Sequence, residues 1–193
     1  LPMFRKEFEI PEDIENARIY VQSPGFACYY INGKNITEDL FISAISDYSK
    51  ILWYNTYDVT PFLQKGKNVI GVIPGNGFFN ESMTSAWNYD KAPWRDAPQF
   101  LLSLFVNNKK VLVSDNTFRF NRKDSPIIFS QLRSGEYYDA RKADDSWMFV
   151  GFDDSHWNTA IERKDTPSGE LRLTPCQPVR EVEVIEPVSI TRV

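Results

Sequence analysis

Residues 27–34 read Ala-Cys-Tyr-Tyr-Ile-Asn-Gly-Lys, and they are the clearest single indication of how this chain folds. The run of apolar and aromatic side chains ends in the pair Asn32-Gly33. Asparagine and glycine accept the positive φ angles that a two-residue hairpin turn requires. The stretch therefore predicts a strand, a tight turn and a return strand, and we interpret Asn32 and Gly33 as structural.

Strand signals continue on both sides of this hairpin. Residues 4–10 and 17–21 alternate between apolar and polar side chains, as half-buried strands do. Residues 69–73 form a continuous apolar run, which is typical of a strand covered on both faces. Further strands are expected at residues 51–57, 99–106, 111–114, 118–121 and 127–130, with a capped helical turn at residues 58–63. Because no amphipathic helix separates these strands, the sequence predicts an all-β, antiparallel jelly-roll β-sandwich rather than an α/β fold.

The composition limits the classes of protein to which the chain can belong. Its 193 residues are 42% hydrophobic and 15% aromatic, which is enough for one domain with a sizeable core. A net charge of −4 disfavours nucleic acid and anionic membranes as partners. No apolar run approaches the roughly 20 residues of a membrane span, and residues 1–8 do not resemble a signal peptide. The compartment stays open, with a periplasmic or secreted location favoured over a cytoplasmic one.

Few residues of the chain suit metal or nucleophile chemistry. The histidine is His156, and the two cysteines are Cys28 and Cys176. Two unpaired core thiols are favoured over a disulfide. These residues are too few for the usual zinc sites, and no nucleophile elbow accompanies His156, so we expect neither zinc binding nor catalysis by this histidine.

Residues 75–98 break the strand pattern and form the first candidate site. A loop of this length in a compact domain is usually functional. Its aromatic rings can stack on the apolar face of a sugar, and its oxygen-bearing side chains are of the kind that calcium binds. The alternative is a loop that buried aromatic side chains pin to the sandwich. The candidate residues are Asn76, Asn80, Trp87, Tyr89, Asp90, Trp94 and Asp96.

Residues 135–141 read Gly-Glu-Tyr-Tyr-Asp-Ala-Arg and form the second candidate site. Glu136 and Asp139 are the residue types of a glycosidase acid–base pair, but spacing in sequence does not set the distance between two carboxyl groups. Arg141 can neutralise either acid. We therefore favour a structural or ligand-contact role for Glu136, Tyr138, Asp139 and Arg141 over catalysis.

Residues 152–157 read Phe-Asp-Asp-Ser-His-Trp and predict a tight turn. Aspartate and serine stabilise such turns through hydrogen bonds from side chain to backbone. We expect Trp157 to fill the core beside the turn. After it, residues 164–178 have the composition of a linker, and residues 181–184 and 188–191 are expected to form a last strand and an exit segment. The domain prediction is a sandwich over residues 1–163, then a linker and exit strand over residues 164–193.

Several motifs together resemble the N-terminal domain of bacterial α-L-rhamnosidases. Residues 135–141 are similar to that family's Gly-Glu-x-Tyr-Asp-Ala-Arg signature, and Gly75-Asn76-Gly77 is similar to its glycine-rich step. The other matching stretches are residues 17–21, 30–34, 57–60, 66–72 and the turn at residues 152–157. In order along the chain, the matches run from about Phe4 to Trp157.

The resemblance implies a galactose-binding-like, jelly-roll accessory domain of a multidomain glycoside hydrolase. Catalytic acids of the family lie on a separate helical barrel, so no catalytic residue is expected in this chain. The resemblance implies rhamnose-containing glycans as ligands and the remaining enzyme as a partner. Some members carry a related domain that binds L-rhamnose through calcium, and the positions matching such a site are Asn76 and Asp96. Two alternatives stay open: a purely structural domain that packs against a neighbouring domain, and a self-contained glycosidase that uses Glu136 or Asp139.

Overall fold

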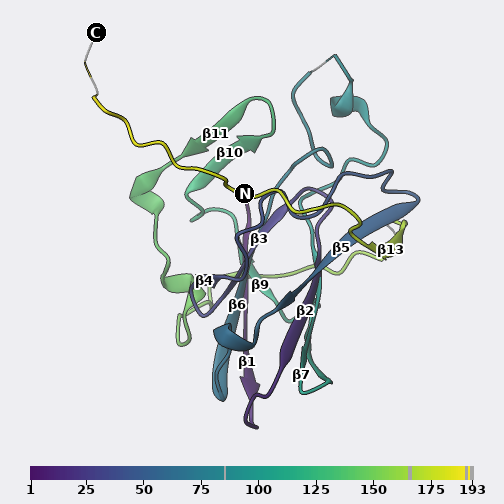
Figure 1. Cartoon of the computed structure of the whole chain (residues 1–193). Coiled ribbons are helices and arrows are strands. Elements are labelled where there is room, and N and C mark those ends of the chain that lie inside the picture. Colours follow the sequence, from purple (N-terminus) through teal and green to yellow (C-terminus); the bar gives the residue numbers. More distant parts are fainter. Residues whose placement is uncertain (85, 165–166, 190, 192–193) are drawn as a thin grey trace.

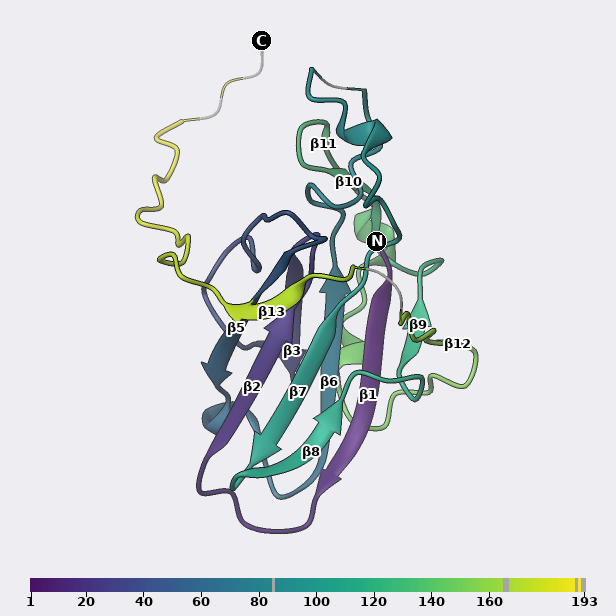
Figure 2. The same cartoon turned by 90° about the vertical axis from the view of Figure 1, so that its right-hand side faces the viewer.

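Two β-sheets face each other across a hydrophobic core (Figures 1 and 2). The computed structural model of the chain describes every residue except 85, 165–166, 190 and 192–193. One sheet has the strand order β12 (Asn158–Thr159), β9 (Arg119–Asn121), β1 (Met3–Ile10), β6 (Gly66–Pro74), β3 (Ala27–Ile31), β4 (Lys34–Asn35). The other has the order β13 (Glu170–Leu173), β5 (Ile51–Asp58), β2 (Ala17–Gln22), β7 (Leu101–Val106), β8 (Lys109–Val113).

The chain wraps around the core by alternating between the two sheets. Strands β1, β3 and β6 lie in the six-stranded sheet, whereas β2, β5 and β7 lie in the five-stranded sheet. A separate hairpin, β10 (Ile127–Gln131) and β11 (Gly135–Tyr138), projects at one end of the sandwich (Figure 1). The predicted all-β, jelly-roll sandwich is confirmed, with one parallel pairing, β13 with β5, among antiparallel ones. In the described residues, no helix is both long enough and apolar enough to cross a membrane.

The core follows from the period-two alternation of the strands. Side chains on one face of β2 and β7 point inward and meet the inward face of β3 and β6. The buried members on these strands are Ala17, Ile19, Val21, Leu102, Leu104, Val106, Tyr29, Ile31, Ile70 and Val72. Burial of this apolar area is the main favourable term for the fold.

The predicted local elements near β3 are also present. Asn32 and Gly33 have φ angles of 50° and 80°, which confirms the hairpin turn. The helical turn is a short 3-10 helix, η1 (Thr60–Phe62), and the Asp58 carboxylate accepts a hydrogen bond from the Thr60 amide at 2.9 Å. Such a side-chain contact fixes the entry into the turn.

Three predictions need correction. Cys28 and Cys176 are unpaired as expected, but both are exposed, so the prediction that they are core thiols is wrong. Residues 181–184 form no strand. Residues 164–178 were expected to be a linker, yet β13 lies within them and pairs with β5. Residues 188–191 lie partly outside the described residues, and the domain boundary after residue 163 stays a prediction.

The segment from η4 (Ser146–Met148) to Trp157 packs on the outer face of the six-stranded sheet. Trp147, Met148 and Trp157 form a second apolar cluster there with Met3 of β1. A Cβ atom on Gly71 of β6 would lie 2.7 Å from the Trp147 ring, so glycine is what allows this close contact. The prediction that Trp157 fills a core beside a tight turn is confirmed.

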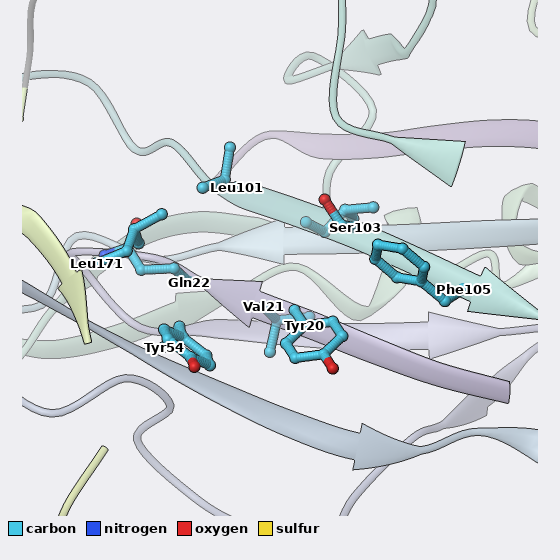
Figure 3. Close-up of a pocket in the computed structure, with 9 residues that line it drawn as sticks. Tyr20, Val21, Gln22, Tyr54, Leu101, Ser103, Phe105 and Leu171 are labelled. Atoms are coloured by element: carbon cyan, nitrogen blue, oxygen red, sulfur yellow. The ribbon is translucent and has the colours of Figure 1, made fainter. Parts of the chain in front are cut away.

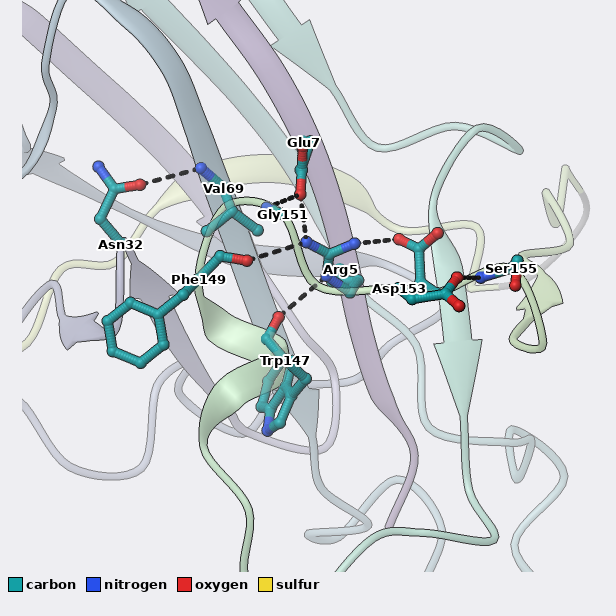
Figure 4. Close-up of polar contacts among 10 residues, drawn as sticks. Arg5, Glu7, Asn32, Val69, Trp147, Phe149, Gly151, Asp153 and Ser155 are labelled. Carbon is teal, nitrogen blue, oxygen red and sulfur yellow. Dashed lines mark hydrogen bonds and ion pairs between the residues drawn. The ribbon is translucent and has the colours of Figure 1, made fainter.

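Arg5 of β1 is the polar anchor of this outer layer (Figure 4). Its side chain is only 1% exposed. It donates to the backbone carbonyl oxygens of Trp147 at 2.9 Å and of Phe149 at 3.2 Å. Its guanidinium also pairs with the carboxylates of Glu7, at 2.8 Å, and of Asp154. Because a buried charge is costly unless it is fully paired, these four contacts make Arg5 tolerable and fix residues 147–154 against the sheet.

We predict that Arg5→Met lowers the free energy of unfolding by about 3 kcal/mol, because it leaves two acids and two carbonyl oxygens without their donor. Urea denaturation followed by tryptophan fluorescence measures this change. Two of the five tryptophans, Trp147 and Trp157, lie in the affected layer.

Arg172→Met is the matched control. Arg172 is more than half exposed and pairs with Glu170 at 2.7 Å on the surface. An exposed pair of this kind contributes less than about 1 kcal/mol. Equal losses in the two variants would contradict the anchoring role of Arg5.

Candidate functional site

The loop of residues 75–98 starts with a tight contact between backbones. Gly77 has a φ angle of +46°, and a Cβ atom there would lie 2.8 Å from the backbone of Gly25. A Cβ atom on Gly25 would in turn lie 2.4 Å from the Gly75 carbonyl oxygen. The glycines of this step therefore allow two turns of the same chain to pack closely.

The amides of Asn76 and Asn80 connect this loop to the β10–β11 hairpin. The Asn76 Nδ2 donates to the Ser130 carbonyl oxygen at 2.7 Å, and its Oδ1 accepts from the Asn80 Nδ2 at 2.8 Å. Gln131 accepts from the Ser82 amide at 3.1 Å and is itself buried. We call residues 75–98 together with β10 and β11 the loop–hairpin unit, since these hydrogen bonds join them.

The three candidate aromatic residues of the loop differ in environment. Trp94 packs with buried Tyr48 and Phe79 in a small core of its own. Tyr89, in the 3-10 helix η2 (Tyr89–Lys91), contacts the rings of Trp94 and Trp87. Trp87 is 57% exposed, and the Arg133 guanidinium of the hairpin lies 3.6 Å from its ring centre. Such a cation–π contact holds an exposed indole in place.

The two residues expected to bind calcium are engaged with other groups. The Asn76 oxygen accepts from Asn80, and the Asp96 carboxylate pairs with Arg163 at 2.9 Å. The Arg95 guanidinium lies 3.4 Å from the Asn80 oxygen. In the part of the chain that the structure describes, no group of three or more His, Cys, Asp or Glu side chains is arranged to hold a metal. Amide donors and guanidinium groups beside the oxygens do not suit a calcium ion, and the calcium site stays a prediction.

The second set of candidates lies at the end of the hairpin. Asp139 precedes the 3-10 helix η3 (Ala140–Lys142) and accepts from the Arg141 backbone amide at 3.2 Å. The Arg141 side chain pairs with both oxygens of the same carboxylate, at 2.8 and 2.9 Å. Glu136 and Tyr138 of β11 are exposed. Asp139 and Arg141 are therefore brought together, whereas neither bonds to the loop candidates.

This arrangement disfavours acid catalysis by Asp139. The hydrogen bond from the Arg141 side chain holds the pKa of Asp139 below its ordinary value. A general acid at neutral pH needs the opposite shift, because it must keep its proton until the transition state. His156 is exposed and lies 3.8 Å from Asp124, with both side chains 57% exposed. An exposed pair of this kind is of little use as a catalytic dyad without a nucleophile beside it.

Two contacts described above, Arg5 with Asp154 and Arg133 with Trp87, could not be predicted from the sequence. Arg5 lies 149 positions from Asp154, and Arg133 lies 46 positions from Trp87. The alternation of β1 places Arg5 on the same face as Glu7 and Glu9, which is typical of a solvent-facing side, so nothing in the local sequence predicts that its guanidinium is buried.

Comparison with known proteins agrees with the geometry of the fold. Residues 12–183 match the family model described as the α-L-rhamnosidase N-terminal domain. The chain belongs to this family. It is 31% identical to an α-L-rhamnosidase of Alteromonas sp. (strain LOR), over 98% of this chain and 21% of that protein. It is 30% identical to one of Formosa agariphila, over 82% of this chain and 17% of that protein.

Solved rhamnosidase structures contain the same fold. The α-L-rhamnosidase from Dictyoglumus thermophilum superposes with a TM-score of 0.83 at 33% identity, over 97% of this chain and 20% of that one. The Streptomyces avermitilis α-L-rhamnosidase complexed with L-rhamnose superposes with a TM-score of 0.85 at 27% identity, over 94% of this chain and 18% of that one. This rhamnosidase domain thus spans about a fifth of the length of its relatives, as one domain of a longer multidomain chain.

We predict that Asn76→Asp destabilises the chain by about 1–3 kcal/mol, because a carboxylate cannot donate to the Ser130 carbonyl oxygen and repels it. Thermal melting with calcium chloride and with a chelator measures the effect. The same loss is expected in both conditions. Asn158→Asp, at an exposed position, is the matched control and should be close to neutral. If calcium raised the melting temperature of the unmodified chain and restored that of Asn76→Asp, the structural role of Asn76 would be wrong.

Proposed function

We propose that this chain is a non-catalytic accessory domain of an α-L-rhamnosidase, and that its loop–hairpin unit packs on the rest of that enzyme. The observation that carries the proposal is a contrast within the unit. Its polar candidates Asn76 and Asn80 already bond to neighbouring groups of this chain, whereas several of its large apolar side chains are exposed. Catalysis would then belong to the part of the enzyme outside this chain.

The exposed apolar side chains suit a partner surface. Tyr137 and Tyr138 of β11 are 65% and 55% exposed, and Ile128 of β10 is 57% exposed. Met83, Trp87 and Leu132 add to the same unit. Apolar groups gathered on a monomer surface generally mark an interaction site. The partner we infer is the remainder of the rhamnosidase chain, because the relatives continue well beyond the matched region.

A rhamnose-containing glycan is the second candidate partner of this unit. The rings of Trp87 and Tyr138 are accessible, and the similar S. avermitilis enzyme has been crystallised with L-rhamnose. An aromatic ring beside polar groups suits the two faces of a sugar. Calorimetry with L-rhamnose, with and without calcium, distinguishes this candidate from docking alone. A periplasmic or secreted location for the enzyme stays a prediction.

We predict that Tyr137→Ser has different effects in two contexts. In the 193-residue chain, the ring is 65% exposed and packs on the Phe129 ring, 5.1 Å between centroids, so the free energy of unfolding should fall by only about 0.5 kcal/mol. In the full-length enzyme the ring would be buried at a domain contact, and its loss should lower the melting temperature of this domain by about 3 °C or more. Differential scanning calorimetry of both proteins measures the two values.

Ile161→Ser is the matched control for this experiment. Ile161 is 81% exposed and lies outside the loop–hairpin unit. It should be close to neutral in both contexts. An equal, small effect of Tyr137→Ser in the chain and in the enzyme would overturn the docking proposal.

A further inference from the structure

A groove of about 310 Å³ lies on the outer face of the five-stranded sheet, away from the loop–hairpin unit (Figure 3). Outward-facing side chains of β2, β5 and β7 form its floor, and β13 adds one side. Its lining residues are Tyr20, Val21, Gln22, Tyr54, Leu101, Leu102, Ser103, Phe105 and Leu171. Ligand sites in proteins start at about this size.

Three aromatic rings give the groove flat apolar surfaces. The Tyr20 ring lies 6.1 Å from that of Tyr54 and 5.8 Å from that of Phe105, measured between centroids. Tyr20 is 37% exposed, and Leu101 at the rim is 44% exposed. These rings lie on the outer, solvent-facing side of the sheet, whereas aromatic side chains are more often buried in the core.

Gln22 supplies an unused polar group in this apolar setting. Only 5% of the residue is exposed, and its side-chain amide makes no hydrogen bond within the described part of the chain. The Ser103 hydroxyl on the adjacent strand likewise has no bond there. The Gln22 amide is not one of the fully buried polar groups, so what it meets in the groove is solvent. A ligand that supplied donors and acceptors could replace the water at this amide, whereas an apolar ligand would cover the amide and leave it without a partner.

The lining also restricts the charge of a ligand. None of the nine lining residues is an acid or a base. Beside the groove, the Lys110 ammonium lies 5.9 Å from the centre of the Phe105 ring. It would repel a cationic ligand, and an anionic ligand would lose its hydration against an uncharged lining, so a neutral ligand is favoured. An apolar side chain from a neighbouring domain would fill the groove but leave the Gln22 amide unpaired. A pyranose has both an apolar C–H face for the rings and hydroxyls for the amide.

We propose that this groove is a subsite for a neutral saccharide, with one pyranose stacked on Tyr20 or Tyr54 and hydroxyls bonded to the Gln22 amide. The subsite is independent of the proposed docking through the loop–hairpin unit, because it lies on different strands. It would give the domain a glycan contact on the outer face of the sandwich.

Nuclear magnetic resonance titration of the ¹⁵N-labelled chain tests the subsite. The probes are methyl α-L-rhamnopyranoside, methyl β-D-glucopyranoside and methyl β-D-galactopyranoside, each to about 50 mM, a range that detects dissociation constants of about 1 mM and weaker. At least one probe should shift backbone amide signals of β2, β7 and β13. Absence of shifts with all three, or shifts confined to residues 75–98 and 127–138, would overturn the proposal.

Two variants make the test specific. Gln22→Leu keeps the size of the side chain but removes its polar atoms, so affinity should fall about tenfold or more while stability is unchanged or higher. Ile161→Ser, at an 81% exposed position outside both the groove and the loop–hairpin unit, should leave the titration unchanged. Equal affinity in Gln22→Leu and the unmodified chain would contradict the assigned role of the amide. Loss of the response in the full-length enzyme would show that another domain covers the groove, which would also overturn the proposal.

Discussion

The buried guanidinium of Arg5 is the interaction on which the outer layer of this domain depends. Two sheets with a core between them need only apolar alternation, but residues 146–157 must also be held on the outside of one sheet. Arg5 does this by donating to Trp147 and Phe149 and by pairing with Glu7 and Asp154. The charge is stable there only while all of these partners are in place, so the segment and the strand fix each other.

In this layer and elsewhere, most polar motifs of the chain are engaged in hydrogen bonds within the domain. Asp153 accepts from the Ser155 amide at 3.0 Å and shapes the turn before Trp157. Asp139 is bound by Arg141, and Asn76 by Ser130 and Asn80. What remains open to partners is the apolar surface of the loop–hairpin unit at one end and the neutral groove on the five-stranded sheet. In the function that we propose, the polar motifs are structural and the aromatic surfaces provide most of the recognition.

Local chemistry explains how much of this could be predicted from the sequence. Alternation predicted β1 and β2, a continuous apolar run predicted β6, and Asn32-Gly33 predicted the turn after β3, because each signal lies within a few residues. The motifs at residues 75–77 and 135–141 were sufficient to predict the family. The match of residues 12–183 to the family model confirms that prediction. Strand β11 was missed because its residues are all exposed and carry no alternation. Strand β13 was missed because its pairing with β5 is set by residues 119 positions away.

The candidate site was harder to predict because its contacts, like the pairing of β13, join segments that are far apart in the sequence. The sequence supplied the residue types, but the partners that decide their roles come from distant segments, as Arg133 does for Trp87 and Ser130 for Asn76. Asp139 and Arg141 are near neighbours, as are Asn76 and Asn80. The prediction that Arg141 can neutralise an acid of its own motif is confirmed by its ion pair with Asp139. Arg141 pairs with Asp139 and not with Glu136, and Glu136 is exposed on β11. The role of Glu136 therefore has to be measured.

The most direct test of a structural role for these acids is the kcat of the full-length enzyme on an aryl α-L-rhamnoside, with Glu136→Gln and Asp139→Asn made separately. A kcat within about twofold of the unmodified enzyme is predicted for both variants. A fall of about 100-fold or more in either one, with the fold intact, is the size of effect expected for a lost general acid or base and would contradict the account.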